Sequence, residues 1–258
     1  MKQYAVVGHP LEHSLSPALF SAEFKQLCLD SSYVKEDVLT SELSAVIKKV
    51  RQDVYAGLSI TVPYKTDVLQ YLDRLSPEAM AIGAVNCVYK QDGVVYGENT
   101  DWVGFKKALA EHTDLKGKSV LIYGAGGAAR ACLFALSDFK KNVSLTNRSK
   151  DKGVRLAEEY GVKFVEKTKL QNCDIFINAT SSGLATNVEP VISEADLANT
   201  TLVFDLLYGE TLLTKTAHKL GIETVDGKKM LLYQAERQFE LFTGQKAPIE
   251  AMGKALSL

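Results

Sequence analysis

The apolar positions in the first third of the chain fall into short runs separated by amphipathic stretches. Three stretches have the composition typical of strands, residues 4–7, 33–38 and 56–62. Ser16 and Pro17 favour the start of a helix that continues to about residue 27. Residues 41–51 place their apolar side chains on one helical face, at Leu43, Val46, Ile47 and Val50. Strands and helices therefore alternate here, which predicts parallel pairing of the three strands.

The pattern changes after residue 62. Residues 65–72 and 77–82 have helical spacing. Two alternating runs, residues 85–89 and 94–96, flank Asp92-Gly93, which predicts a β-hairpin because this dipeptide suits a tight two-residue turn. The first hundred residues therefore predict an α/β domain of their own.

A second alternating series begins near residue 120. Residues 101–111 predict a connecting helix, and strand-like runs follow around residues 120, 144, 164, 175, 203 and 224. The last two helical stretches, about 228–242 and 249–256, have no strand after them and are free to pack back on the first domain. We therefore expect two α/β domains: residues 1–101 with 233–258, and a Rossmann-type domain over residues 102–232.

A glycine-rich turn follows the strand near residue 120. Gly124, Gly126 and Ala129 occupy the three small-residue positions of the dinucleotide fingerprint. The first permits the turn, the second admits a pyrophosphate, and the third lets the helix pack closely on its strand. The free N–H groups of the helix start favour an anion. Such a turn also occurs as a purely structural bend, so this motif alone leaves both interpretations open.

The next strand ends at the place where a Rossmann unit contacts the adenosine ribose. Asn147, Arg148 and Ser149 stand there, without the acidic residue that would bind a ribose hydroxyl. A guanidinium with short polar donors favours a 2′-phosphate, so we expect NADP rather than NAD. The alternative is that Arg148 is a solvated loop arginine.

The composition of the chain indicates which classes of binding partner to expect. The 258 residues carry a formal charge of −1 and are 46% hydrophobic, so we expect no nucleic-acid partner. No apolar run approaches the length of a membrane span or of a signal peptide, so we expect no membrane partner either. The widely spaced Cys28, Cys87, Cys132 and Cys173 form no metal-binding pattern and predict reduced thiols in a cytoplasmic protein.

The first domain carries three polar clusters at expected strand or helix ends. In the first, Ser14 and Ser16 stand at a helix start and could bind a carboxylate, although Ser16 could simply be an N-cap. In the second, Ser59 and Thr61 share a strand face, and Lys65 follows where a helix dipole disfavours a cation.

The third cluster combines an amide with a carboxylate. Asn86 stands near the start of the hairpin, and Asp101 ends the run Glu-Asn-Thr-Asp just after it. Asp101 could also be only the N-cap of the connecting helix.

These motifs together resemble the shikimate dehydrogenase family over nearly the whole chain and in the same order. The shared elements are G-x-P-x-x-H-S-x-S-P (8–17), P-x-K (63–65), G-A-x-N (83–86), G-x-N-T-D (97–101), GAGGAAR (124–130), NRS (147–149), NATSSG (178–183) and the tail 227–244.

The resemblance implies an NADP-dependent oxidoreductase that reversibly reduces 3-dehydroshikimate to shikimate in aromatic amino-acid (chorismate) biosynthesis. It implies Lys65 and Asp101 as the catalytic pair, with Lys65 exchanging the proton. The substrate-binding residues that it implies are Ser14, Ser16, Ser59, Thr61, Lys65, Asn86, Asp101, Tyr208 and Gln234. The cofactor-binding residues that it implies are Gly124, Ala125, Gly126, Gly127, Ala128, Asn147, Arg148, Ser149, Thr180, Ser181, Leu206 and Gly227, with no metal. We expect small-molecule partners only, and a monomer or a homodimer.

The chain departs from the family pattern at three places. Ser59 replaces a common asparagine, Leu19-Phe20 replaces a usual His-Asn, and the segment after Tyr208 is shorter. A serine hydroxyl offers fewer hydrogen bonds on a shorter arm, so we expect weaker binding of a substrate hydroxyl there. The alternatives are a quinate-preferring or otherwise divergent dehydrogenase, or a nucleotide-sensing regulator without turnover.

Overall fold

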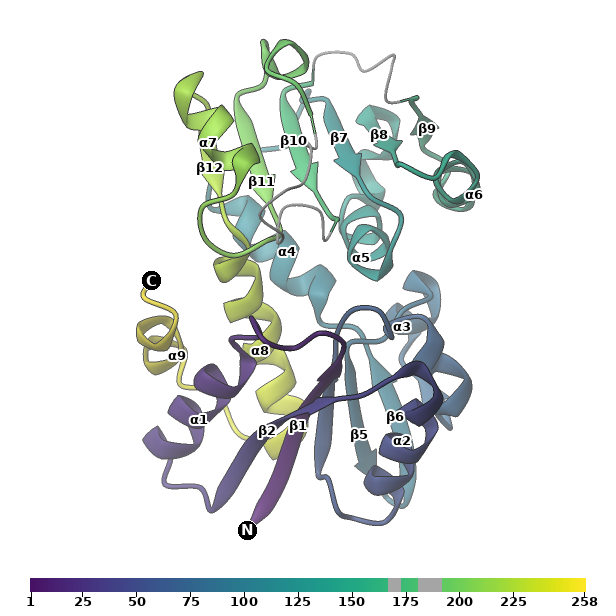
Figure 1. Cartoon of the computed structure of the whole chain (residues 1–258), viewed down its shortest axis with the longest axis vertical. Helices are drawn as coiled ribbons and strands as arrows, with labels where there is room; N and C mark the ends of the chain where they lie inside the picture. Colours follow the sequence, from purple (N-terminus) through teal and green to yellow (C-terminus); the bar gives the residue numbers. More distant parts are fainter. Residues whose placement is uncertain (167–172, 181–191) are drawn as a thin grey trace. The chain divides into compact units, whose positions relative to one another are not determined.

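The computed structural model describes residues 1–166, 173–180 and 192–258, which divide into two compact units (Figure 1). Unit 1 comprises Met1–Gly104 and Leu232–Leu258, and unit 2 comprises Phe105–Leu231. The chain leaves unit 1 within helix α4 (Asp101–Ala110) and returns within helix α8 (Gly227–Thr243). Each unit is described by itself.

Unit 1 is built on a mixed sheet with strand order β2-β1-β3-β5-β6-β4. The predicted parallel strands pair as expected: β1 (Lys2–Gly8) lies between β2 (Ser31–Asp37) and β3 (Gly57–Ile60). Strands β5 (Cys87–Gln91) and β6 (Val94–Glu98) continue the sheet as an antiparallel hairpin. Asp92 and Gly93 both have positive φ, 52° and 78°, as a tight hairpin turn requires.

Alternation along β1 gives this sheet two different faces. Ala5 and Val7 join the apolar core that α2 (Leu43–Arg51) covers. Tyr4 points to the other face, where its ring stacks on Phe242 of α8 at 5.2 Å and lies 5.3 Å from Phe24 of α1 (Ser16–Gln26). Helix α9 (Ile249–Ala255) packs on α1. The C-terminal helices therefore pack back on the first domain, as predicted.

Two local expectations were wrong. Residues 65–72 do not form an α-helix, because the Lys65 carbonyl accepts a hydrogen bond from Val85 N at 2.8 Å and so leaves the helical pattern. Only a 3₁₀ turn, η2 (Asp67–Tyr71), forms there, followed by the short strand β4 (Arg74–Leu75) and helix α3 (Pro77–Ile82).

Ser16 is not the N-cap of α1: Leu15 holds that position, without a side-chain cap. A 3₁₀ turn, η1 (Thr40–Glu42), precedes α2.

Unit 2 contains a parallel sheet with strand order β12-β11-β10-β7-β8-β9. Its strands are β7 (Val120–Tyr123), β8 (Val143–Thr146), β9 (Lys163–Phe164), β10 (Ile175–Asn178), β11 (Leu202–Asp205) and β12 (Glu223–Val225). In chain order this is the Rossmann arrangement, with three strands on either side of the crossing between β7 and β10. The predicted fold class, two α/β domains of which one is of Rossmann type, is confirmed.

Helices connect the parallel strands of unit 2. Helix α5 (Gly127–Ala135) packs on β7, α6 (Lys150–Tyr160) on β8 and β9, and α7 (Leu212–Lys219) on β11 and β12. The 3₁₀ turns η3 (Ser137–Asn142) and η5 (Ala195–Leu197) complete the described connections. Within the described ranges, no helix has both the length and the apolar character needed to cross a membrane.

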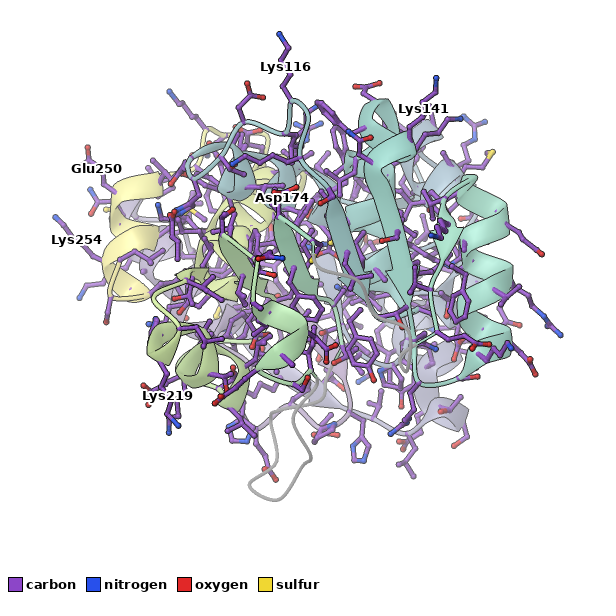
Figure 2. All side chains as sticks on the ribbon, turned by 90° about the horizontal axis from the view of Figure 1, so that it is seen from above. Lys116, Lys141, Asp174, Lys219, Glu250 and Lys254 are labelled. Carbon is purple, nitrogen blue, oxygen red and sulfur yellow. The ribbon has the colours of Figure 1, made fainter. Side chains whose placement is uncertain are left out.

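Reciprocal hydrogen bonds between Ser119 and Asp174 lie at the amino-terminal edge of this sheet. Asp174, labelled in Figure 2, accepts hydrogen bonds from Ser119 N at 2.7 Å and Ser119 Oγ at 2.6 Å, and its own N–H donates to that hydroxyl at 3.0 Å. These bonds lower the pKa of Asp174. The two residues immediately precede β10 and β7, so the opposite, carboxyl edge of the sheet is left for ligand binding.

Candidate functional site

Three loops of unit 1 meet at one edge of its sheet. The carboxyl ends of the parallel strands β1 and β3 are neighbours, and His9 N donates to the Val62 carbonyl at 3.0 Å. The hydrogen bond from Val85 N to the Lys65 carbonyl joins the third loop to the second. The backbone therefore brings together the three polar clusters that the sequence indicates.

An ion pair lies at the centre of this edge. Lys65 Nζ is 2.6 Å from Asp101 Oδ2, and the two side chains are only 16% and 6% exposed. The other carboxylate oxygen, Oδ1, accepts a hydrogen bond from Asn86 Nδ2 at 2.9 Å. The same amide group lies 3.1 Å from Gln234 Oε1 and 3.0 Å from Thr100 Oγ1. The carboxylate is therefore held from both sides.

The hairpin positions this pair. Cys87 pairs with Glu98, and Asn86 N donates to the Glu98 carbonyl at 3.1 Å, so the start of β5 and the end of β6 lie side by side. Asn99 locks the loop, since its Nδ2 donates to the Ala84 carbonyl and its Oδ1 accepts from Asp101 N. Asp101 is the first residue of α4, where a negative charge suits the helix dipole, and its carboxylate bonds to side chains outside that helix.

This arrangement is suited to proton transfer. An ammonium group can donate a proton or, once neutral, accept one, and a carboxylate within hydrogen-bond distance orients it. Partial burial strengthens the electrostatic interaction compared with that in open solvent. The edge can therefore act on a polar molecule that carries an alcohol or a carbonyl group.

The other predicted substrate residues of unit 1 belong to the loops and elements around this edge. Ser14 and Thr61 are half-buried, and Ser16 is 9% exposed. Ser59 is buried, and its hydroxyl is hydrogen-bonded inside the unit to Tyr33 and Gln238. Tyr208 belongs to unit 2, where it follows β11 and is 37% exposed. Their contacts with a substrate stay predictions.

The predicted cofactor residues lie at the carboxyl edge of the unit 2 sheet. Tyr123 pairs with Thr146 and Asn178, and Asn178 pairs with Asp205, so these strand ends are in register. The predicted residues that follow these ends are Gly124–Ala128, Asn147–Ser149, Thr180 and Leu206, while Gly227 follows β12. Ser181 was also predicted and lies outside the described residues.

The glycine-rich turn has the geometry that a dinucleotide requires. Gly124 has φ +136°, and a Cβ there would lie 2.7 Å from the Ala179 carbonyl oxygen, so only glycine fits. Gly126 is the N-cap of α5 and carries no side-chain cap. A Cβ on Gly126 would have no atom within 4 Å, which leaves space for a phosphate above the free N–H groups. These residues therefore fit a pyrophosphate.

The second predicted contact is a short loop before α6. Gly124 N donates to the Thr146 carbonyl at 2.9 Å, which joins this loop to the glycine-rich turn. Asn147 Nδ2 donates to the Ser149 carbonyl, and Ser149 is the N-cap of α6 without a side-chain bond. Arg148 is exposed, and no hydrogen bond or ion pair of its side chain is found among the described residues. An anion could therefore bind the guanidinium and the helix start together.

Sequence reasoning missed a buried carboxyl group behind this edge. Asp205 is fully buried and accepts hydrogen bonds from Asn178 Nδ2 at 2.9 Å and Thr211 Oγ1 at 2.6 Å. Burial raises its pKa, although these bonds act in the opposite direction. Asn178 in turn accepts from Thr180 N and Oγ1. An acidic residue at the end of an apolar strand was the signal available for Asp205.

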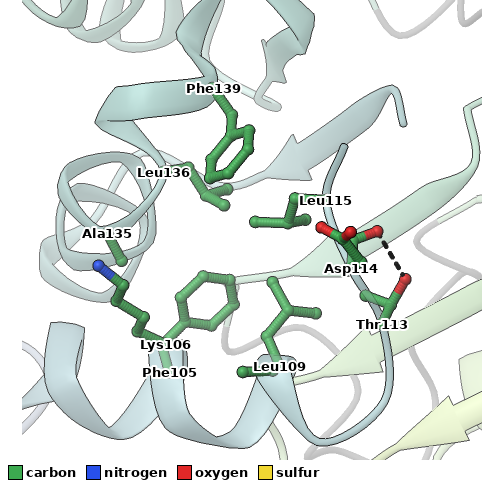
Figure 3. A pocket seen from close by; sticks show the side chains of 10 residues that line it. Phe105, Lys106, Leu109, Thr113, Asp114, Leu115, Ala135, Leu136 and Phe139 are labelled. Carbon is green, nitrogen blue, oxygen red and sulfur yellow. Dashed lines mark hydrogen bonds between the residues drawn. The ribbon is translucent and has the colours of Figure 1, made fainter. Parts of the chain in front are cut away.

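Unit 2 also contains an apolar cavity of about 160 Å³ (Figure 3). It is lined mainly by Phe105, Leu109, Leu115, Leu136 and Phe139. Ala135 and Leu136 place it at the C-terminal end of α5, opposite to the glycine-rich turn. No predicted site residue lines it, so it does not belong to the candidate site.

Three families of known proteins match successive parts of the chain. Residues 6–88 match the shikimate dehydrogenase substrate binding domain, and residues 106–207 match the family described as shikimate / quinate 5-dehydrogenase. Residues 229–256 match the shikimate 5′-dehydrogenase C-terminal domain.

Individual relatives match over almost their full length. A curated protein named shikimate dehydrogenase (NADP(+)), from Methanocaldococcus jannaschii, is 39% identical over 271 residues, which cover 99% of this chain and 96% of that protein. The crystal structure of shikimate dehydrogenase from Aquifex aeolicus gives a TM-score of 0.93 at 32% identity and covers 99% of this chain and 97% of that one. A structure from Thermus thermophilus, in complex with NADP(H) and shikimate, gives 0.89 at 35% identity and covers 100% and 99%.

Proposed function

Because the chain belongs to the shikimate dehydrogenase family, we propose that it catalyses the reversible, NADP-dependent reduction of 3-dehydroshikimate to shikimate. This reaction belongs to aromatic amino-acid (chorismate) biosynthesis. The observation that carries the proposal is the partly buried contact between Lys65 and Asp101, with Asn86 on the second carboxylate oxygen. It supplies a proton donor and acceptor at the edge of unit 1 where three family motifs meet.

In this proposal unit 1 binds the substrate. Lys65 exchanges the proton of the reacting hydroxyl at Nζ, and Asp101 orients the ammonium group through Oδ2. Asn86, Gln234 and Thr61 bind ring hydroxyls, and Ser59 was predicted to do the same. Ser14 and Ser16 bind the ring carboxylate, with Tyr208 of unit 2 as a further candidate. A polar ring with several hydroxyls requires such a set of short donors and acceptors.

Unit 2 holds the cofactor in this proposal. Gly124, Ala125, Gly126, Gly127 and Ala128 bind the pyrophosphate, and Asn147, Arg148 and Ser149 bind the 2′-phosphate. Thr180, Ser181, Leu206 and Gly227 complete the set. The bound cofactor would supply the redox chemistry, as hydride acceptor for the oxidation of the alcohol carbon and as hydride donor for the reverse reaction. The open space at Gly126 and the uncapped start of α6 support this assignment.

The relatives named above fit this activity rather than the alternatives. All three are named shikimate dehydrogenase, and the printed names of two of them also include NADP. A regulator would also have no use for a partly buried ion pair suited to proton transfer.

We further propose a cytoplasmic enzyme that acts as a monomer or a homodimer and binds small molecules but not nucleic acid. The formal charge of −1 supports the absence of a polyanionic partner. The four cysteines are free, which suits a reducing compartment.

The experiment that tests the function is an assay of NADP reduction by the purified chain with shikimate, with quinate and with neither compound. We expect NADPH to form with shikimate at a kcat/KM well above that with quinate, and none without substrate. Repeating the assay with NAD checks the cofactor. Turnover of quinate alone, or no turnover of either compound, would contradict the proposal.

A further inference from the structure

Ser59 belongs to a buried hydrogen-bond chain rather than to an open surface. It is 6% exposed, and its Oγ accepts a hydrogen bond from Tyr33 Oη at 2.6 Å. The same hydroxyl donates to Gln238 Oε1 at 2.5 Å. The single proton of the serine and one of its acceptor positions are therefore used inside unit 1.

Gln238 extends this chain to the candidate active site. It is 1% exposed, and its Nε2 donates to the main-chain carbonyl of Asn86 at 3.0 Å. That carbonyl also accepts from Ile60 N at 2.8 Å, so both of its acceptor positions are filled. Gln238 thus links the middle of β3 to the residue whose side chain holds Asp101.

The link has consequences for geometry at the reacting group. Asn86 Nδ2 contacts Asp101 Oδ1, and Lys65 contacts the other oxygen of that carboxylate. A shift of the Asn86 backbone would therefore change the position of the carboxylate that orients Lys65. Small displacements of a catalytic group reduce rates strongly, because the reaction depends on its alignment.

We propose that Ser59 and Gln238 are a positioning pair for Asn86, and that Ser59 is not a substrate ligand. The proposal rests on the proposed shikimate dehydrogenase function. The Ser59 hydroxyl fixes Oε1 of Gln238, which directs Nε2 of the same amide at Asn86, and Tyr33 fixes the hydroxyl from behind. Ser59 of β3 and Gln238 of α8 together place an amide group against the Asn86 carbonyl. An asparagine at residue 59 could supply such an amide group by itself.

The first test removes the hydrogen bond from Gln238 to Asn86 and keeps the volume of the side chain. Gln238→Met retains a long side chain but cannot donate to Asn86, and Ser59→Ala removes the hydroxyl that orients the amide. We expect kcat/KM for shikimate to fall about tenfold in Gln238→Met, the loss of one hydrogen bond, with part of the loss in kcat. Ser59→Ala should show a smaller fall in the same parameters. The dissociation constant for NADP should not change.

The matched control is Tyr64→Phe. Tyr64 is 1% exposed and donates to the Val38 carbonyl at 2.6 Å, so this change also removes one buried hydrogen bond from unit 1 without touching Asn86. We expect its kcat/KM to stay within about twofold of wild type, since only stability is affected. If Gln238→Met fails to fold, Ser59→Ala is judged against the same control.

The decisive test is rescue. Ser59→Asn alone should lower kcat/KM because Gln238 already fills the space, whereas Ser59→Asn with Gln238→Ala should recover much of the activity lost in Gln238→Ala. Wild-type kinetics in the Gln238 variants, or losses equal to those of Tyr64→Phe, would overturn the positioning role. A wild-type chain without turnover of shikimate would instead overturn the proposed function, and this inference with it.

Discussion

At the scale of single residues, the contact between Lys65 and Asp101 gives the most direct prediction. The pair is nearly buried, with 2.6 Å between Nζ and Oδ2. Lys65→Met and Asp101→Asn should each lower kcat by about 10² to 10⁴, the usual contribution of a positioned acid–base group. Because the two groups act as a unit, the double variant should lose much less than the product of the two single losses. Steady-state kinetics with shikimate measure both effects.

Lys90→Met is the control for that prediction. Lys90 forms an ion pair with Asp53 in the same unit, at 2.5 Å, but lies outside the candidate site. Its kcat should stay near that of wild type. Fully multiplicative losses at Lys65 and Asp101, or a kcat close to normal in either, would remove the pair from the mechanism.

Arg148 should determine the preference for NADP. Its exposed guanidinium stands at the start of α6, where a 2′-phosphate would gain a charge-assisted hydrogen bond of about 1.5 to 3 kcal/mol. Arg148→Ala should therefore reduce the NADP/NAD ratio of kcat/KM by about ten- to a hundredfold. Arg155→Ala, an exposed arginine within α6, is the control. An unchanged ratio in Arg148→Ala would show that another residue discriminates.

Glu23 makes the stability of the fold depend on pH. It is fully buried in α1, neither carboxyl oxygen has a hydrogen-bond partner among the described residues, and burial raises its pKa from 4.5 to about 9. Between these values the folded chain keeps the proton that the unfolded chain has lost. The free energy of unfolding should therefore fall as pH rises through this range, by about 1.4 kcal/mol per unit from this group.

Urea unfolding of wild type and Glu23→Gln at several pH values between 5 and 9 measures this effect. The difference in unfolding free energy between the two proteins should grow with pH in favour of the glutamine variant. Glu12→Gln, an exposed position in the same unit, should show no such trend. Parallel pH profiles for wild type and Glu23→Gln would mean that the carboxyl group is solvated or paired.

At this scale, the site motifs could be predicted from the sequence, but the partners of buried polar side chains could not. The sequence indicated Lys65, Asn86 and Asp101, because each ends a motif at a strand or helix boundary. It could not indicate the partner of Ser59, since Gln238 lies 179 residues away and reaches β3 only through the packing of α8 on the sheet. A polar residue in a helix gives no signal of the distant atom that it will bond.

At the scale of elements, two glycines of the same turn should behave differently. Gly126 has φ −101° and ψ −171°, angles that any residue adopts, and a Cβ there would enter the open space that the pyrophosphate fills in the proposed complex. Gly126→Ala should therefore keep its melting temperature but bind NADP weakly. Gly124→Ala should lose stability, because φ +136° and the Ala179 carbonyl oppose any side chain.

Thermal unfolding and NADP titration of the two variants separate these effects. Gly93→Ala, at the hairpin turn of unit 1, is the control for a glycine with positive φ that does not belong to the cofactor edge. Its NADP affinity should equal that of wild type. Normal NADP binding by Gly126→Ala would mean that the pyrophosphate lies elsewhere.

Elements with a clear period were the predictable part of the fold. The hairpin, the parallel strands and the C-terminal helices follow from patterns several residues long. The helix predicted over residues 65–72 was wrong because Val85 N, which is distant in sequence, donates to the Lys65 carbonyl that a helix would need as an acceptor. Strand β4 has only two residues, Arg74–Leu75, too few to show any period.

At the scale of the whole molecule, each compact unit has its own sheet and its own apolar core. In the proposed assignment, each unit also has its own ligand. A ligand that binds only the folded state stabilises it by about 2.7 kcal/mol at a hundred times its dissociation constant. Since opening reactions are local, that stabilisation should appear first in the unit that holds the ligand.

Hydrogen–deuterium exchange of the full chain, followed by peptide mass spectrometry, tests this assignment. Saturating NADP should slow exchange most in the peptides that contain the start of α5 and Asn147–Ser149, because their free N–H groups would bond to phosphates. Shikimate should slow exchange most around Asn86 and Asp101, whose backbone and side chains are already linked through Thr100 and Asn99. Gly126→Ala should abolish the first pattern and leave the second. Protection by NADP confined to unit 1, or by shikimate confined to unit 2, would contradict the assignment, because the chemistry of each edge would then have been attributed to the wrong ligand.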